Sequence, residues 1–248
     1  MNRHPIVLFV HIPKAAGTGA AILFYEQYKE KLGVIDMNVW DRWQELMQAT
    51  PYRYDCLFGH FSYGIHEDIP RVAEYTSVMR NPIDAIVSYH SFIVRNPDHP
   101  FRQFMGNGSL EQFLKLPPEL LFVFRNYQTT MLTGKLNATA SEAIELIERK
   151  YPVLGTVERL PETIYFWQKR YGWGEAAMRM EEGKNASEAP RKLSLAEIRG
   201  IEELVRVDLD VYSFVRSRLA QKIIALPSGE KAAIREFKET GRLSPFRY

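Results

Sequence analysis

Cysteine is almost absent from this chain: Cys56 is the only one among 248 residues. A single cysteine excludes an internal disulfide and every metal site built from several cysteines. Because Leu57 and Phe58 follow it, we interpret Cys56 as a buried strand residue. Net charge is also small, since 32 basic residues nearly offset 30 acidic ones. That balance argues against nucleic acid and membrane surfaces as partners bound through overall charge.

Long apolar runs are missing as well. The N-terminal run Ile6–Val10 is far shorter than the roughly 20 residues of a membrane-spanning helix, and too short for a signal-peptide core. No other stretch approaches the spanning length. We therefore expect no transmembrane segment and a cytoplasmic protein. A chain trimmed from a membrane-anchored parent would have the same sequence features.

Two further absences narrow the chemistry. The six histidines form neither a His-Glu-x-x-His motif nor a histidine–cysteine cluster. The sequence has no Gly-Lys-Ser/Thr ending of a Walker A loop, and nothing resembles the aspartate and Ser/Thr pair that holds magnesium in P-loop NTPases. We therefore expect no metal cofactor.

What is present is an ordinary globular composition, with 46% hydrophobic and 25% charged residues and no internal repeat. Length and composition predict one domain over residues 1–248. Short runs rich in β-branched and aromatic residues alternate with helical patterns, which favours a three-layer α/β fold with a central, mainly parallel sheet flanked by helices. The predicted strands are 6–11, 34–39, 55–60, 75–80 and 153–157.

Apolar residues at three- and four-residue spacing predict the helices. They are 18–31, 41–48, 82–94, 109–116, 140–151, 162–171, 194–204 and 209–226, with a polar loop at 183–190. The strongest start signal is Asn81 followed by Pro82, an N-cap with proline at the first helical position.

The first motif with chemical content joins the strand at 6–11 to the helix at 18–31. It reads Val10-His-Ile-Pro-Lys14-Ala-Ala-Gly17-Thr18-Gly19. A turn of small residues lets backbone N–H groups converge on an anion at a helix N-terminus, and the lysine adds positive charge. The two glycines allow close approach, and the threonine adds a hydroxyl. Because the lysine precedes the glycines, the loop is not a Walker A loop, which counts against an ordinary kinase.

The second motif reads Ser77-Val-Met-Arg80-Asn-Pro82-Ile-Asp84-Ala-Ile-Val-Ser88. Arg80 can bind a phosphate with two hydrogen bonds, and Ser88, about two helical turns on, can donate to the same group. The carboxyl ends of parallel strands meet at one sheet edge, where such folds bind ligands, so both motifs should meet there. Considered alone, each residue also has a structural interpretation. Arg80 would then pair with a nearby carboxylate, and Ser88 would simply be packed in the fold.

Together the two motifs resemble those of sulfotransferases that use 3′-phosphoadenosine-5′-phosphosulfate (PAPS). The run Pro13-Lys14-Ala15-Ala16-Gly17-Thr18-Gly19 is similar to their 5′-phosphosulfate loop, and Arg80 through Ser88 to their 3′-phosphate motif. The residues of the two motifs are most similar to those of the branch that contains heparan sulfate 2-O-sulfotransferase and related carbohydrate sulfotransferases. Gly19 stands where serine is common, and Asn81 where aspartate is common. The resemblance covers roughly residues 6 to 225 and implies a P-loop-like fold.

Further segments follow in the family's order. Phe58-Gly59-His60-Phe61 is similar to the branch's glycine–histidine segment, which implies that His60 is the catalytic base. Arg125–Thr129 and Gly155–Arg159 resemble weaker landmarks. The tail Lys238–Arg242 would correspond to a basic flap over the nucleotide.

Several other side chains are candidates of lower rank. His11 reads as a structural residue of the loop, with His66 and His90 as alternative bases. We interpret the four tryptophans as core or groove-wall residues rather than as surfaces that bind a sugar ring. We interpret three basic residues as part of a solvated face rather than as contacts for an anionic acceptor. These are Trp40, Trp43, Trp167 and Trp173, and Arg95, Arg102 and Lys115.

The resemblance implies transfer of a sulfuryl group from PAPS to an acceptor hydroxyl, with 3′-phosphoadenosine-5′-phosphate (PAP) as product. Residues Pro13 to Gly19, Arg80 and Ser88 would bind the nucleotide. His60 would take the acceptor's proton, and Lys14 would stabilise the leaving phosphate. The implied acceptor is a carbohydrate or a glycolipid. Two alternatives stay open: an atypical P-loop kinase acting on a small molecule, and a non-catalytic module that binds a nucleotide or a glycan. The residues choose neither the position sulfated nor an oligomeric state.

Overall fold

The sheet at the centre of the molecule has five strands, all parallel. In this computed structural model, which describes residues 4–35, 52–177 and 192–244, they run in the order β2-β3-β1-β4-β5. Their bounds are β1 Ile6–Val10, β2 Leu32–Ile35, β3 Cys56–Gly59, β4 Ala73–Met79 and β5 Val153–Thr156. The central strand, β1, therefore comes first in the chain and pairs with β3 on one side and β4 on the other.

Both faces of the sheet are covered, which explains why the central strand β1 is an unbroken apolar run. Successive side chains of a strand point to opposite faces. Ile6, Leu8 and Val10 of β1 accordingly belong to one core cluster, and Val7 and Phe9 to the other. Each is at most 5% exposed. The result is three layers, helix–sheet–helix, as the sequence predicts.

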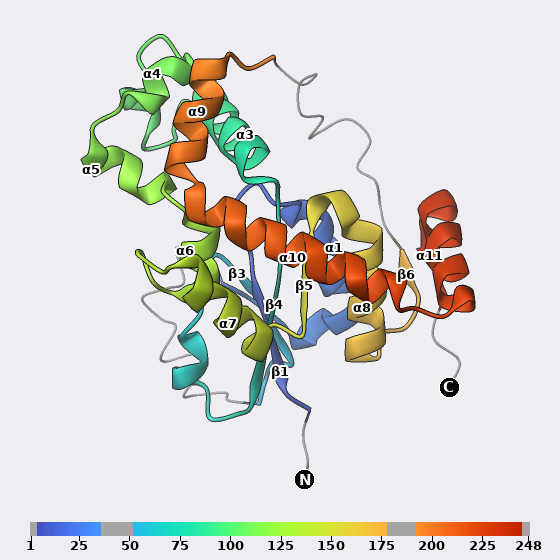
Figure 1. Cartoon of the computed structure of the whole chain (residues 1–248). Coiled ribbons are helices and arrows are strands. Elements are labelled where there is room, and N and C mark those ends of the chain that lie inside the picture. The colour runs from blue at the N-terminus through green and yellow to red at the C-terminus, as the bar shows by residue number, and fades with distance from the viewer. Residues whose placement is uncertain (1–3, 36–51, 178–191, 245–248) are drawn as a thin grey trace.

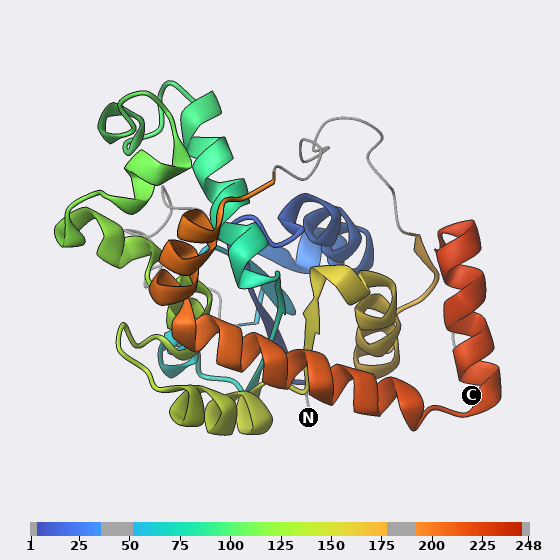
Figure 2. The same ribbon diagram turned by 45° about the horizontal axis from the view of Figure 1, so that its top comes forward.

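One face carries α3 (Pro82–Arg95), α6 (Tyr127–Thr133), α7 (Ala140–Lys150), α9 (Leu195–Leu204) and α10 (Arg206–Ile224). Figure 1 shows the short helices α4 (Leu110–Leu114) and α5 (Pro118–Leu121) grouped with α9 beside α3, and Figure 2 shows α10 running the length of this layer. Helix α3 begins at Pro82, just after the carboxyl end of β4 at Met79.

The other face is covered by α1 (Gly17–Tyr28), α8 (Leu160–Tyr171) and α11 (Ser228–Thr240). A two-stranded antiparallel sheet, β6 (Ala176–Ala177) with β7 (Arg242–Leu243), follows α8 and α11. Short 3₁₀ helices span Lys29–Lys31, Ile65–Asp68, Arg102–Phe104, Phe122–Phe124 and Val157–Arg159. None of the helices in the described ranges is long and apolar enough to cross a membrane.

The five predicted strands are confirmed within a few residues, although β2 starts two residues before the predicted 34–39. The predicted helices 18–31, 82–94, 109–116, 140–151, 162–171, 194–204 and 209–226 correspond to α1, α3, α4, α7, α8, α9 and α10. The predictions for 36–39, 41–48 and 183–190 lie outside the described residues. Helices α5, α6 and α11 were not predicted.

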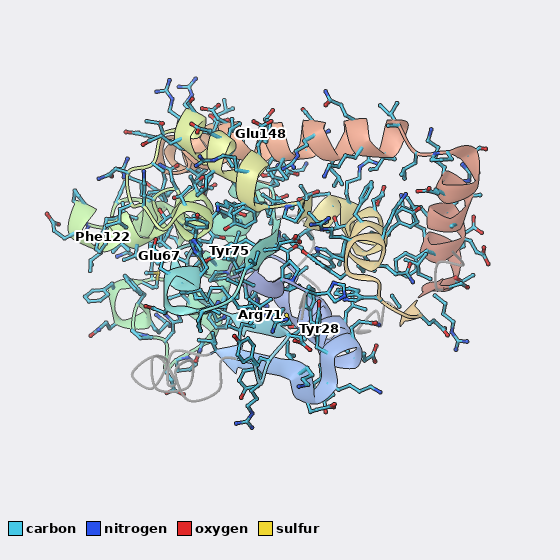
Figure 3. The ribbon with its side chains drawn as sticks, turned by 90° about the horizontal axis from the view of Figure 1, so that it is seen from below. Tyr28, Glu67, Arg71, Tyr75, Phe122 and Glu148 are labelled. Atoms are coloured by element: carbon cyan, nitrogen blue, oxygen red, sulfur yellow. The ribbon has the colours of Figure 1, made fainter. Side chains whose placement is uncertain are left out.

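Arg71 joins the amino ends of the three central strands. Its guanidinium donates to the carbonyl oxygen of His4 at 2.7 Å and to that of Tyr54 at 2.9 Å, and it lies 3.0 Å from a carboxylate oxygen of Asp55. Only 7% of the Arg71 side chain is exposed. Figure 3, which views the molecule from below, shows Arg71 and Tyr75 near the centre of this side. The charge is thus compensated at the end of the sheet opposite the candidate site.

Candidate functional site

The strand order places the candidate site. The connection after β1 leads to β2 on one side of the sheet, and the connection after β4 leads to β5 on the other. Loops that leave adjacent strands in opposite directions open a crevice at the carboxyl edge, where ligands bind in open α/β folds. The loop of residues 11–16 and Arg80 follow these two strands. The two predicted motifs therefore meet at this switch point.

The loop after β1 ends in a helix N-terminus without a side-chain cap. Lys14 and Ala16 have left-handed backbones, with φ of 66° and 54°. Each such residue other than glycine costs roughly 1–3 kcal/mol. Ala16 is the N-cap of α1 and has no side-chain oxygen to accept from the first N–H groups of the helix. By contrast, Asn81 at α3 accepts from the N–H groups of Ile83 and Asp84. The free N–H groups and the helix dipole at α1 favour an anion.

Three side chains from two other segments hold the loop and its strand in place. The hydroxyl of Tyr127 donates to the carbonyl of Pro13 at 3.2 Å, and Nη1 of Arg80 to the carbonyl of Lys14 at 3.3 Å. The buried hydroxyl of Ser77 donates to the carbonyl of Val10 at 2.5 Å. The second motif therefore supports the first directly, and Arg80 lies against the loop.

Positive charge accumulates where the two motifs meet. Nζ of Lys14 lies 4.6 Å from the centre of the Phe92 ring. Burial lowers the pKa of Lys14, and repulsion from Arg95 and Arg80 lowers it further. Within the described ranges, none of these three cations lies within 4.0 Å of a carboxylate oxygen. Such a cluster favours an anionic ligand, which would relieve the repulsion.

Helix α3 turns one face toward the loop. Residues three, four and seven apart share a helix face, so Ser88, Phe92 and Arg95 form a stripe along α3. The Phe92 ring carries the contact with Lys14, which places the stripe beside the loop. Ser88 is half-buried on this face. Arg95, which the sequence suggested lies on a solvated face, is thus close enough to act on Lys14 electrostatically.

The backbone of Arg80 is fixed by a buried amide. Gln128 accepts from the N–H of Arg80 and donates to its carbonyl, both at 3.0 Å, much as a neighbouring strand would. The N–H of the next residue, Asn81, donates to a carboxylate oxygen of Glu158 at 2.9 Å. These contacts explain two weak landmarks: Gln128 belongs to Arg125–Thr129, and Glu158 to Gly155–Arg159. The sequence analysis gave neither residue a role.

Helices α6 and α10 cap each other beneath Gln128. Asp208 of α10 accepts from the N–H groups of Gln128 and Thr129, at 3.3 and 2.7 Å. Asn126, just before α6, accepts from the N–H groups of Val207 and Asp208. Burial raises the pKa of Asp208 to about 6, against the lowering effect of its hydrogen bonds to Thr129 and Gln128. This arrangement fixes the start of α6 and, through Gln128, the position of Arg80.

His60 follows β3 and is exposed on the other side of the loop. Its Nδ1 lies 2.8 Å from the carbonyl oxygen of His11. A carbonyl oxygen can only accept, so Nδ1 carries the hydrogen and the neutral ring leaves a lone pair on Nε2. The two imidazole rings also stack, with centroids 4.1 Å apart and planes inclined by 23°. The geometry is that of an oriented imidazole able to accept a proton at Nε2.

The remaining sequence candidates lie elsewhere. His90 is buried, with its ring 5.6 Å from that of Phe113. Nδ1 of His66 lies 3.0 Å from the hydroxyl of Tyr75. Trp167 and Trp173 belong to the core around Phe24, and Trp40 and Trp43 lie outside the described residues. In the tail, Nζ of Lys238 lies 2.8 Å from a Glu162 oxygen, and its role as a flap remains a prediction.

No protein-family model matches the chain, and no curated protein matches its sequence. Among solved structures, the crystal structure of mouse sulfotransferase SULT7A1 complexed with PAP is similar, at 13% sequence identity and a TM-score of 0.41. The match covers 81% of this chain and 64% of that one, so the chain spans just under two thirds of that protein's length. At this degree of likeness, the activity has to be argued from the residues of the site.

Proposed function

We propose that this chain transfers a sulfuryl group from PAPS to a hydroxyl of an acceptor. The observation that carries the proposal is one sheet edge that combines an uncapped helix N-terminus, clustered cations and an oriented histidine. The first two features suit a ligand with several anionic groups, and the third supplies a base beside them. PAPS has anionic groups at both the 5′ and the 3′ positions, in keeping with the two cationic motifs that meet at this edge.

The two motifs would bind different ends of the donor, PAPS. The loop Pro13 to Gly19, with its N–H groups and Lys14, would hold the 5′-phosphosulfate, and Arg80 with Ser88 the 3′-phosphate. PAPS supplies a sulfuryl group joined to a phosphate that leaves as part of PAP. Lys14 is held over Phe92 by a cation–π contact of about 0.5–1 kcal/mol, weak enough to be exchanged for a phosphate oxygen.

Two side chains would act on the reacting atoms. Nε2 of His60 accepts the proton of the acceptor hydroxyl as its oxygen attacks sulfur, a role typically worth about 10²–10⁴ in rate. Lys14 offsets the charge that develops on the phosphate oxygen as the sulfur–oxygen bond breaks. One preplaced donor of this kind is worth roughly 10²–10³ in rate.

We extend the proposal to a carbohydrate or glycolipid acceptor, on the resemblance of the loop and of the His60 segment to carbohydrate sulfotransferases. The same proposal describes a cytoplasmic, single-domain enzyme that needs no metal. An ATP-dependent small-molecule kinase and a non-catalytic binding module are the alternatives that the first experiment must separate from it.

The first experiment is a calorimetric titration with PAP, then with ADP, and with ATP plus magnesium. PAP should bind more tightly than ADP, because only PAP offers a 3′-phosphate to Arg80. Arg80→Ala should weaken PAP binding about 10- to 100-fold, the loss of a charged hydrogen-bonding partner, and weaken ADP binding much less, through the lost contact with the loop alone. Arg235→Ala, an exposed arginine on α11, is the matched control. A preference for ATP with magnesium would contradict the proposal and favour the kinase.

Transfer itself is measured with labelled PAPS and a panel of hydroxyl acceptors. His60→Ala should keep PAP affinity and lower the transfer rate about 10²–10⁴-fold, since the proton acceptor is gone. Unchanged transfer would remove His60 from the mechanism. Tight PAP binding without transfer to any acceptor by the wild-type chain would favour the binding module.

A further inference from the structure

His11 contacts the phosphate loop and the candidate base at the same time. Its carbonyl oxygen accepts from Nδ1 of His60 at 2.8 Å, and its ring stacks on the His60 ring at 4.1 Å. The ring also lies against Gly17, where the methyl carbon of an alanine would come within 1.6 Å of Nε2 of His11. The backbone of His11 is fixed as well, since its N–H donates to the carbonyl of Gly59 at 2.8 Å.

The contacts at His60 restrict the ring in two different ways. The hydrogen bond fixes which nitrogen carries the proton only while it is kept, and a ring held by one bond can still turn away from the carbonyl and lose it. The stacked imidazole of His11 restricts that rotation because the two planes are inclined by only 23°. The ring of Phe58, with its centroid 5.2 Å away, supports His11 from the strand.

The supporting ring also has to stay uncharged. Burial lowers the pKa of His11 to about 4, and the neighbouring His60 acts in the same direction. A charged ring at this distance would repel the imidazolium that forms when His60 accepts a proton. A neutral ring and a carbonyl oxygen favour that imidazolium instead, because the Nδ1–H bond strengthens when its donor becomes charged.

We propose that His11 is a positioning residue, which holds His60 in its Nδ1–H tautomer and couples the orientation of that ring to the phosphate loop. The inference rests on the proposed function for its kinetic consequence, but its geometric content concerns the free protein. His11 thereby takes the part that a carboxylate plays beside the histidine of hydrolase triads, with a peptide carbonyl as the orienting acceptor.

The step that His11 supports is the transfer of the sulfuryl group from PAPS to the acceptor hydroxyl. The acceptor oxygen forms a bond to sulfur, the bond between sulfur and the phosphate oxygen breaks, and its electrons leave with PAP. The acceptor's proton moves to Nε2 of His60, and from there to water. His11 neither gains nor loses a proton in this step.

Two substitutions of similar size separate stacking from space-filling. His11→Phe keeps a flat ring over His60, and His11→Leu fills the volume without a flat face. Both keep the backbone carbonyl. The matched control is His4→Ala, an exposed histidine beyond the amino end of the same strand.

The first readout needs no substrate: ¹⁵N NMR of histidine-labelled protein reports which ring nitrogen of His60 carries hydrogen. We expect a single Nδ1–H tautomer in wild type, His11→Phe and His4→Ala, and a mixture of tautomers in His11→Leu. A single Nδ1–H tautomer in His11→Leu would overturn the proposal, as would a mixture in the wild-type protein.

The second readout is kinetic, with PAPS and an acceptor found in the panel. His11→Leu should lower kcat about tenfold with KM for PAPS little changed, while His11→Phe should retain most of kcat, since only the orientation of the base differs. Equal losses in both variants would contradict a role for stacking. If the wild-type chain transfers nothing, the proposed function fails, and the tautomer measurement still decides the geometry.

Discussion

Two glycines of one loop illustrate how sharply neighbouring positions can differ. At Gly17 an added methyl carbon would collide with the imidazole of His11, whereas at Gly19 it would meet nothing within 4 Å. Neither glycine has a positive φ, so the difference is one of space rather than backbone conformation. In the sequence they look alike, and both were assigned to phosphate binding.

Substitution by alanine should therefore have opposite effects on stability at the two positions. Gly17→Ala should destabilise the fold by about 1–3 kcal/mol, since the His11 ring has to move. Gly19→Ala should stabilise it by roughly 0.5–1 kcal/mol, the usual gain of alanine over glycine in a helix. Unfolding in denaturant measures both, and equal effects would show that His11 yields easily.

The half-buried imidazole of His11 should make folding pH-dependent. Its pKa is lowered to about 4 in the folded chain, against 6.5 for an unperturbed histidine. Between these two pKa values the unfolded state binds a proton at His11 and the folded state does not. The contribution of His11 to the free energy of unfolding is therefore complete above pH 6.5 and is lost as the pH falls toward 4. Between pH 7.5 and 5 the loss amounts to about 2 kcal/mol.

The measurement is the free energy of unfolding at these two pH values, in wild type and in His11→Phe. Other groups titrate in the same range, so the difference between the proteins carries the result. The variant should lose about 2 kcal/mol less than wild type on acidification. Equal losses in the two proteins would mean that His11 takes up a proton freely when folded.

At the scale of elements, α6 is the helix that the sequence did not predict and on which the site depends most. It is short, and its N-terminus is capped by Asp208, which is 80 residues away from Gln128 in the chain. Helix periodicity and local capping signals read neighbours in sequence, so they cannot detect such a cap. The connected contacts run from Asp208 through Gln128 to the backbone of Arg80.

Removing this cap should destabilise the chain more than an ordinary surface change. Asp208→Ala leaves two buried N–H groups without an acceptor and should lower the free energy of unfolding by about 2 kcal/mol. Asp210→Ala, an exposed aspartate on the same helix, is the control and should change it by less than about 0.5 kcal/mol. Similar small losses for both would mean that the cap contributes little. A loss of PAP affinity in Asp208→Ala would show that the contact reaches Arg80.

At the scale of the whole molecule, the sequence predicts the layers well because periodicity and apolar runs determine them. Each predicted strand is confirmed to within two residues at its described ends, and the loop and Arg80 lie at one sheet edge, as the order of strands requires. What the sequence could not give is contact between distant side chains. Arg95 beside Lys14, Gln128 at Arg80 and His11 under His60 all follow from tertiary packing.

Binding at this edge should be visible in global unfolding, because the site joins the three central strands. At a concentration one hundred times its Kd, PAP should add about 2.7 kcal/mol to the free energy of unfolding. For a chain of this size, that raises Tm by roughly 5–10 °C in a thermal scan. ADP at the same concentration should give a smaller shift, and an equal one would show that the 3′-phosphate is not recognised.

The position of β1 at the centre of the sheet also has a consequence for how the chain folds. Strand β1 has no strand partner close to it in the sequence, and Ser77, whose hydroxyl donates to the last carbonyl of β1, lies 67 residues further along. Closing so many residues between paired strands makes for slow folding and long exposure of apolar segments. The anion loop, the histidine and the arginine sit at the ends of β1, β3 and β4, so a partly folded chain that lacks any of these strands has no site at all. The rate at which ligand binding recovers during refolding would therefore report when the sheet is complete.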